Sequence, residues 1–302
     1  MSNPIIEDIK LKMKSGNPIT RLIFINVVVF VVISVLRIIL LISGNASSIQ
    51  SLVSFVVDNI SFPISFQELL FKPWTIITYM FTHIQPFHLL WNMITLYWFG
   101  QLFSDYTSPK KIIPLYLLGG IVGAFITLLL ITFIPVFAPY LGSPMVGASA
   151  GITAIIIAVA TLMPNYKLNL LFVGPVKLIY LALFVVFIDV LSVASYDNVG
   201  GNIAHLGGAL MGYIYSIQYK KGRDLSSGIA RFLVWLGNLF KSKPKSKMNV
   251  AYKRAVSDEE YNYNKKITQE QIDTILDKIS KSGYESLTKT EKDILFKASN
   301  KK

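Results

Sequence analysis

Two polar residues in otherwise apolar stretches have the chemistry of a serine-dependent hydrolytic site. Ser149 lies in the small-residue run GASAG (residues 147–151), and His205 lies in AHLGG (residues 204–208). A serine hydroxyl is a weak nucleophile until a neighbouring base takes its proton, and an imidazole can be that base. The pair therefore predicts acyl transfer, with Ser149 as the nucleophile and His205 as the general base.

Acyl transfer also needs hydrogen-bond donors where negative charge develops on the carbonyl oxygen. Asn92 follows His88 by four residues, so both would project from one face of a helix. We expect the donors to be the Asn92 amide, a His88 ring N–H and the backbone N–H of Ser149 at a helix N-terminus. His83 completes the set of three histidines in the chain.

Glycines accompany both reactive residues. Gly147 and Gly151 keep bulk away from Ser149. Gly208 and Gly212 form a small-xxx-small pair after His205, a pattern that lets membrane helices pack closely. We expect this close packing to bring the serine and the histidine within hydrogen-bond reach.

The composition indicates that membrane-spanning helices position these residues. The chain has 302 residues, of which 53% are hydrophobic and only 15% are charged, against roughly 25% charged in a soluble protein. It has no cysteine, which excludes a disulfide scaffold and a thiolate metal site. The apolar runs are residues 22–43, 86–103, 111–137, 149–163, 175–195 and 202–219.

A span needs about 20 apolar residues, so we predict an all-α membrane protein with a bundle of six transmembrane helices. The fourth run, 149–163, is short, which would place Ser149 below the membrane surface. His205 begins a helix that runs in the same direction, so the two residues should lie at a similar depth.

Charge asymmetry between loops predicts the orientation, since Lys and Arg stay on the cytoplasmic side. On the opposite predicted side only Lys72 is basic. We therefore expect both termini to be cytoplasmic, in a multi-pass protein of a bacterial cytoplasmic (inner) membrane. The basic residues on the expected cytoplasmic side are Lys10, Lys12, Lys14, Arg21, Lys110, Lys111, Lys167, Lys177, Lys220, Lys221 and Arg223.

Most of the net charge of +12 follows residue 219, which divides the chain. We predict a short N-terminal segment, a membrane domain, a basic amphipathic and linker segment, and a small helical hairpin, with the boundaries 1–21, 22–219, 220–267 and 268–302. The basic run 241–247 favours the lipid bilayer as partner over nucleic acid, which is not expected. The function of residues 220–302 is not readable from their sequence, and an unidentified partner of this tail stays open.

In the hairpin, Gly283 is predicted to end the first helix. Thr288 and Glu291 have the spacing of a capping box for the second helix.

Taken jointly, FTHxxxxHxxxN (residues 81–92), GxS (147–149) and AHxxGxxxG (204–212) resemble the rhomboid family of intramembrane serine proteases. The resemblance covers roughly residues 15–220. It implies a six-span bundle with a Ser–His dyad, no third catalytic carboxylate and no cofactor. The substrates it implies are membrane-anchored proteins, cut in or near their transmembrane segments.

Carried over by matching positions, Ser149 is the nucleophile and His205 the general base. His88 and Asn92 resemble the family's oxyanion-stabilising pair. His83 matches a histidine that supports the site through hydrogen bonds.

Two positions depart from the family pattern, and a third polar residue falls within a predicted span. Residue 150 is Ala where the family often has Gly. Thr153 stands where family members often have an aromatic residue that stacks on the catalytic histidine, which leaves the orientation of His205 to another group. Asp189 lies within the fifth predicted span; we favour a buried protonated or hydrogen-bonded group of the bundle, with a proton relay as the alternative.

The sequence leaves three other functions to compare with this one. A non-catalytic rhomboid-like protein that binds transmembrane helices as a chaperone or adaptor is the main alternative, although such relatives usually lack the Ser or the His. A three-histidine metal site would leave the GASAG motif without a role. A transporter is disfavoured because no inverted repeat is evident.

Overall fold

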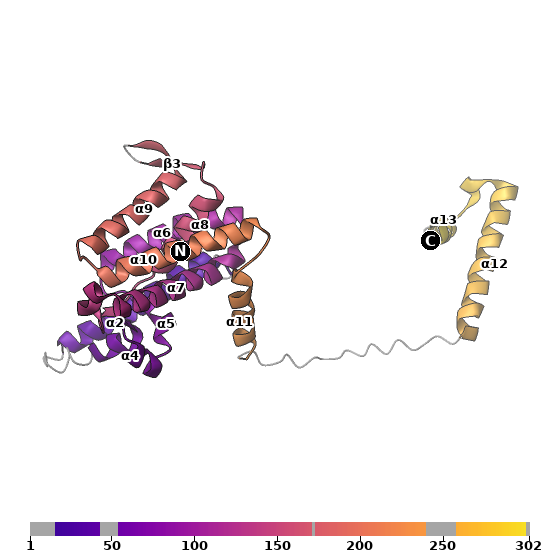
Figure 1. Ribbon diagram of the computed structural model, residues 1–302. Coiled ribbons are helices and arrows are strands. Elements are labelled where there is room, and N and C mark those ends of the chain that lie inside the picture. The colour runs from indigo at the N-terminus through magenta and orange to yellow at the C-terminus, as the bar shows by residue number, and fades with distance from the viewer. Residues whose placement is uncertain (1–15, 43–53, 171–172, 240–257, 300–302) are drawn as a thin grey trace. The chain divides into compact units, whose positions relative to one another are not determined.

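The computed structural model describes residues 16–42, 54–170, 173–239 and 258–299. The chain is mostly helical and divides into two units, Met1–Lys241 and Ser242–Lys302 (Figure 1). Among the predicted features, residues 1–15 with Lys10, Lys12 and Lys14, and the basic run 241–247, lie outside the described residues.

Each of the predicted apolar runs overlaps one α-helix of the first unit. In Figure 1 these helices lie side by side in one bundle. They are α2 (Pro18–Ile42), α6 (Pro86–Tyr106), α7 (Ile112–Phe133), α8 (Ser149–Leu162), α9 (Leu178–Ala194) and α10 (Val199–Lys220).

Helix α8 is the centre of the bundle. Its side chains are buried along almost its whole length, because α6, α7, α9 and α10 all pack against it. Small residues allow the closest of these contacts: a Cβ placed on Gly119 of α7 would meet the Ala154 side chain at 2.4 Å. The short predicted span is thus the most enclosed helix of the first unit's described part.

Two of the predicted runs are helical over only part of their length. The run 111–137 ends as a helix at Phe133, because Ile134 precedes Pro135 and is extended (ψ 113°). A 3₁₀ helix, η3 (Pro135–Tyr140), follows. The run 175–195 begins as a strand, because residues 174–177 pair with residues 167–170. These strands, β3 (Lys167–Leu170) and β4 (Gly174–Lys177), form an antiparallel hairpin between α8 and α9.

The outward faces of the bundle are apolar, as expected for helices surrounded by lipid rather than water. By length and hydropathy, two described helical segments pass a test for a membrane span, Pro18–Ile39 and Pro109–Phe133. Large apolar side chains are also exposed on α6 and α9, including Trp91, Trp98, Leu183, Phe184 and Phe187.

The described part of the long segment before α6 packs on the bundle through polar anchors. The Tyr79 hydroxyl donates a hydrogen bond to the Gly120 carbonyl oxygen of α7 (2.7 Å), and the Tyr116 hydroxyl of α7 donates to the Met80 carbonyl oxygen (2.6 Å). The elements of this segment are a helix over 54–60, β1 (Phe62–Pro63), α4 (Phe66–Phe71), α5 (Thr75–Thr78) and η1 (Tyr79–Phe81).

A two-residue ladder ties this segment to the chain just before α8. Strand β1 pairs antiparallel with β2 (Pro144–Met145), with Phe62 opposite Met145. Both of these side chains are buried. The ladder therefore fixes the approach of the chain to Ser149.

Helix α11 (Ser226–Leu239) is tethered to the bundle by an ion pair. Lys111 Nζ, in η2 (Pro109–Lys111), lies 2.8 Å from Asp224 Oδ2. Partial burial raises the pKa of the Asp224 carboxyl, but hydrogen bonds from Lys111 and Ser226 outweigh burial and leave the pKa below its usual value. Exposed Phe232, Val234 and Trp235 give α11 an apolar face.

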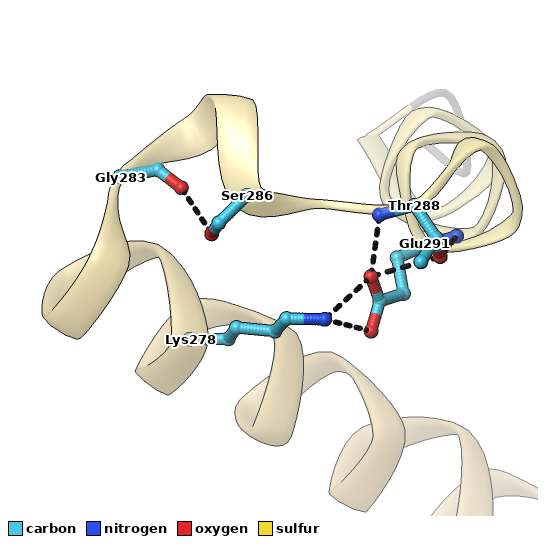
Figure 2. Close-up of polar contacts among 5 residues, drawn as sticks. All are labelled: Lys278, Gly283, Ser286, Thr288 and Glu291. Carbon is cyan, nitrogen blue, oxygen red and sulfur yellow. Dashed lines mark hydrogen bonds and ion pairs between the residues drawn. The ribbon is translucent and has the colours of Figure 1, made fainter.

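The second unit contains α12 (Asp258–Ser282), η4 (Tyr284–Ser286) and α13 (Lys289–Ser299). Gly283, with φ +76°, follows α12 as predicted. The predicted capping box is present: Glu291 Oε2 accepts from the Thr288 N–H (2.7 Å), and Thr288 Oγ1 accepts from the Glu291 N–H (3.4 Å) (Figure 2). Lys278 of α12 also donates to Glu291, which joins the two helices. The first helix starts at 258, ten residues before the predicted hairpin boundary.

Candidate active site

Ser149 is the first residue of α8 and is half-buried. The chain reaches it through Gly147, whose φ of +125° favours glycine. The Gly147 N–H donates to the Tyr79 carbonyl oxygen (2.9 Å), and the Ala148 N–H donates to His83 Nε2 (3.4 Å). The turn before the serine is thus fixed from the segment that precedes α6.

Ser149 and His205 are in hydrogen-bond contact. His205, in the second turn of α10, places its Nε2 2.7 Å from Ser149 Oγ. The other ring nitrogen, Nδ1, lies 2.8 Å from Asp189 Oδ1 on α9. The structure therefore lines up a hydroxyl, an imidazole and a carboxylate from three helices.

Glycine contacts set the spacing of these helices; they include the predicted packing of Gly208 and Gly212, whereas Gly151 lies against α7 rather than beside Ser149. A Cβ on Gly208 would stand 2.1 Å from the Ala150 carbonyl oxygen, and one on Gly212 would stand 2.2 Å from the Ala154 carbonyl oxygen. On the other side of α8, a Cβ on Gly151 would meet the Tyr116 carbonyl oxygen of α7 at 2.6 Å. No side chain fits at these three positions without moving the backbone of the neighbouring helix.

His88 lies beside the nucleophile. A Cβ added to Gly147 would stand 2.9 Å from His88 Cε1 and 3.7 Å from Ser149 Oγ, so the ring and the hydroxyl flank the same backbone position. The His88 ring has no hydrogen-bond partner among the described residues, so it retains a donor for a substrate oxygen.

Asn92 is held one helical turn further along α6, and it is buried. Its Nδ2 donates to the His88 carbonyl oxygen (2.9 Å) and lies 3.3 Å from His83 Nε2. Both amide hydrogens are therefore engaged within the protein, and a role in binding an oxyanion requires one of them to turn away. His83 Nε2 lies within reach of both Asn92 Nδ2 (3.3 Å) and the Ala148 N–H (3.4 Å), which share its single lone pair; His83 thereby connects the oxyanion candidates to the serine turn.

Two cavities meet at the reactive pair. One, of about 580 Å³, is lined by Ser149, His205 and His88 together with residues of the loops before α6, α8 and α10. The other, of about 350 Å³, lies between α6 and α9 and is lined by the same three residues, Trp91, Phe184 and Asp189 among others. The serine is thus reachable from the loop end of the bundle and from between two helices.

A metal site is not formed by the described residues. No group of three or more His, Cys, Asp or Glu side chains within the described ranges is placed to hold a metal ion. His83 and His88 pack edge to face, with ring centroids 5.1 Å apart, which is an aromatic contact and not a chelating arrangement.

Asp189 was not among the predicted site residues, yet it contacts His205. The sequence held a signal for the shared depth of the two residues, although not for the contact itself. Asp189 lies five residues before the end of α9, and His205 lies six residues after the start of α10. At 1.5 Å per residue both stand about 8–9 Å from the connection between the helices, so they share a depth.

The fold and the site define a bundle of apolar helices around a hydrogen-bonded serine and histidine. Comparison with known proteins shows the family to which this bundle belongs. The Rhomboid domain matches residues 71–221, half of the chain, and this chain belongs to the rhomboid family. A second match, over residues 257–301, is to a family of unknown function (DUF6576).

Three curated relatives agree with this assignment. RHOMBOID-like protein 12, mitochondrial, of Arabidopsis thaliana is 32% identical over 49% of this chain and 47% of its own length. Presenilin-associated rhomboid-like protein A, mitochondrial, of Danio rerio is 27% identical over 45% of this chain and 34% of its own length. Presenilin-associated rhomboid-like protein, mitochondrial, of Bos taurus is 25% identical over 45% and 35%. The chain spans less than half the length of each relative.

The expected location in a bacterial inner membrane, with both termini cytoplasmic, is contradicted by this comparison. All three relatives carry mitochondrial names. The physical reason for the error is that loop charges report on the direction of helix insertion and contain no information on the compartment.

Proposed function

We propose that this chain is an intramembrane serine endopeptidase that cleaves membrane-anchored proteins with Ser149 as nucleophile and His205 as general base. The single observation that carries the proposal is the 2.7 Å contact between Ser149 Oγ and His205 Nε2 at the edge of a cavity of about 580 Å³. A base within hydrogen-bond reach of a serine hydroxyl is the geometric requirement for activating it.

The proposed reaction has two stages. In acylation, Ser149 Oγ attacks the scissile carbonyl carbon while its proton passes to His205 Nε2; the C–N bond then breaks and the proton passes to the leaving nitrogen. In deacylation, water gives a proton to Nε2 and its oxygen attacks the ester carbon; the C–Oγ bond breaks and Oγ recovers the proton. Each stage returns the imidazole to its starting state.

The donors for the developing oxyanion are the Ser149 N–H, the His88 ring and Asn92. The N–H of Ser149 lies at the start of α8, where the helix dipole favours negative charge. The His88 ring is unengaged by the described residues, whereas the Asn92 amide must leave one of its present acceptors. Gly147 supports this arrangement, since only the absence of a side chain there lets His88 approach.

The same proposal includes six membrane crossings, by α2, α6, α7, α8, α9 and α10. The large apolar side chains exposed on these helices support it. Helix α8 has 14 residues and rises only about 21 Å, so Ser149 would lie below the membrane surface. Water would then reach it through the larger cavity.

We further propose the predicted order of segments, 1–21, 22–219, a linker from 220 and a C-terminal hairpin, with the hairpin beginning at α12 (residue 258) instead of residue 268. Helix α11 would lie at the membrane surface, with its exposed apolar residues in the interface.

The test is cleavage by the purified full-length protein, reconstituted in liposomes with a panel of membrane-anchored substrates. We expect Ser149→Ala and His205→Ala to abolish cleavage, and a serine-directed fluorophosphonate to label the wild type but not Ser149→Ala. A Ser216→Ala variant is the matched control, because Ser216 is buried on α10 and donates to Ala158 of α8, away from the dyad. Cleavage that survives Ser149→Ala would contradict the mechanism.

The second candidate is a non-catalytic rhomboid-like protein that binds transmembrane helices. The observation that favours it is the smaller cavity between α6 and α9, whose walls are largely apolar. Substrate binding without cleavage, together with no fluorophosphonate labelling of the wild type, would support this candidate over the protease.

A further inference from the structure

The carboxyl of Asp189 is buried and makes one hydrogen bond. Its side chain is 8% exposed, and Oδ1 lies 2.8 Å from His205 Nδ1. Within the described ranges, Oδ2 is buried without any hydrogen-bond partner. Desolvating a carboxyl is costly, and a purely structural carboxyl would recover that cost with several hydrogen bonds. Here His205 is the sole described group that this carboxyl engages.

We propose that Asp189 is the positioning residue of the general base, holding the His205 ring in the tautomer and orientation that the reaction needs. This inference rests on the proposed function. The sequence predicted only a buried group of the bundle at this position. The inference gives Asp189 a role in the site: it acts on His205 and does not touch the substrate.

The donor and acceptor inventory shows how a carboxylate selects the tautomer. An ionised carboxylate can only accept, so His205 Nδ1 must carry the ring proton and donate it to Asp189. Nε2 then has a lone pair, and the Ser149 hydroxyl donates to it. When the serine proton passes to Nε2 the ring becomes positively charged, and the carboxylate stabilises that charge while remaining ionised.

The connection between α9 and α10 holds the carboxyl opposite the ring. Two of its residues, Tyr196 (φ 59°) and Asn198 (φ 40°), are non-glycine residues with positive φ. Such backbone persists where the surroundings demand it. The Asn202 side chain of α10 donates to the Asp197 carbonyl oxygen (2.7 Å), which locks the turn onto the helix that carries His205.

Thr153 explains why the ring needs this support. It lies one helical turn after Ser149, it is buried, and it lines the same 350 Å³ cavity as Asp189 and His205. Its side chain is too small to stack on an imidazole. The described residues give the His205 ring no aromatic stacking partner. A hydrogen bond from the far side therefore takes over the orientation of the ring.

The experiment compares Asp189→Asn, Asp189→Ala and Asp189→Glu in the reconstituted full-length protein, with Ser216→Ala as the control. An amide at position 189 can donate to Nδ1 and so favours the wrong tautomer. We expect Asp189→Asn to lower kcat by at least about 10²-fold with KM changed less than about threefold; the same change in Ser-His-Asp proteases costs about 10⁴-fold in kcat. Fluorophosphonate labelling of Ser149 should slow in parallel.

Chemical rescue separates a positioning role from a structural one. Asp189→Ala leaves space beside His205 in a cavity that opens to the outside, so added formate should restore part of the lost kcat in this variant. Formate should leave Ser216→Ala and Ser149→Ala unchanged. Asp189→Glu, which keeps a carboxylate, should retain more activity than Asp189→Asn.

Two results would overturn the inference. One is a kcat of Asp189→Asn within about twofold of wild type. The other is a loss of activity that follows the loss of thermal stability, with no rescue by formate. If Asp189→Asn does not fold, the formate response of Asp189→Ala and the activity of Asp189→Glu decide. Failure of the proposed function is distinguishable, because wild type and Ser149→Ala would then be equally inactive and equally unlabelled.

Discussion

Gly208 on α10 lies against the carbonyl oxygen of Ala150 on α8, the residue that follows the nucleophile. A Cβ at position 208 would stand 2.1 Å from that oxygen, which is closer than any real contact. Three residues before Gly208 is His205, so this close approach sets the distance between the proposed base and the serine.

Replacement of Gly208 by Ala should therefore impair stability and cleavage together. The new methyl group must push α8 and α10 apart, and overpacking of this kind costs typically 1–3 kcal/mol. The measurement is the thermal midpoint of the reconstituted protein alongside its kcat. Gly228→Ala on α11 is the control: a Cβ there meets nothing within 4 Å, so its cleavage should equal wild type.

Replacement of Gly147 by Ala should lower kcat through displacement of His88, beyond any loss that follows from the lower stability of the strained backbone. The substitution strains a backbone with φ +125° and drives a methyl group to 2.9 Å from His88, which must move. Backbone strain alone costs about 1–3 kcal/mol. Gly142→Ala separates the two effects, because Gly142 also has positive φ (+78°) but a Cβ there meets nothing within 4 Å. Equal kcat in the two variants would show that His88 does not matter at this position.

His88→Ala should lower kcat more than Asn92→Ala does. The His88 ring is unengaged by the described residues and can donate at once, whereas both Asn92 amide hydrogens already have acceptors. Loss of one oxyanion donor costs about 10²–10³-fold in kcat. We expect that range for His88→Ala and a smaller loss for Asn92→Ala, measured as kcat at saturating substrate. The reverse order would identify Asn92 as the principal donor.

Acid should destabilise the start of α13 in the second unit, because Glu291 becomes protonated. Hydrogen bonds from Lys278 and from Thr288 lower the pKa of the Glu291 carboxyl from 4.5 to about 2. A carboxyl with a depressed pKa stabilises the fold above its unfolded pKa, and that stabilisation is lost as the pH falls through the folded pKa. We expect it to be complete above about pH 4.5 and to disappear toward pH 2.

Hydrogen exchange at the start of α13 in the full-length protein, corrected for the intrinsic pH dependence, measures this effect. In Glu291→Gln the protection should be low at every pH in this window. Glu285→Gln is the control, since the Glu285 side chain is 92% exposed and its pair with Lys292 is long, at 3.3 Å. A wild-type profile that is flat between pH 5 and pH 2 would refute the assignment.

The long helices were predictable because a helix in an apolar surrounding must be apolar along its length, and the sequence shows this directly. The depth of Ser149 and His205 followed from counting residues along those helices. The partner of His205 did not follow, since Asp189 meets the ring only through the rotation of α9 about its axis, which packing decides. Strands β1 and β2 have two residues each and no alternating pattern to reveal them.

The start of α12 was misplaced for a different reason. Residues 258–267 are mostly polar and carry no apolar periodicity, so nothing in this stretch indicated that the helix begins before residue 268. The predicted bacterial compartment was wrong because it was inferred from loop charges, which report only the direction of helix insertion.

The ladder between β1 and β2 has a consequence for the order of folding. Its strands come from segments far apart in the sequence, with α6 and α7 between them. The pairing therefore closes a long loop, which lowers the conformational entropy of the chain. We infer that the helices assemble first and that the turn leading to Ser149 takes its final shape late. The proposed serine–histidine pair would then be brought into its final geometry only after α6 and α7 have packed.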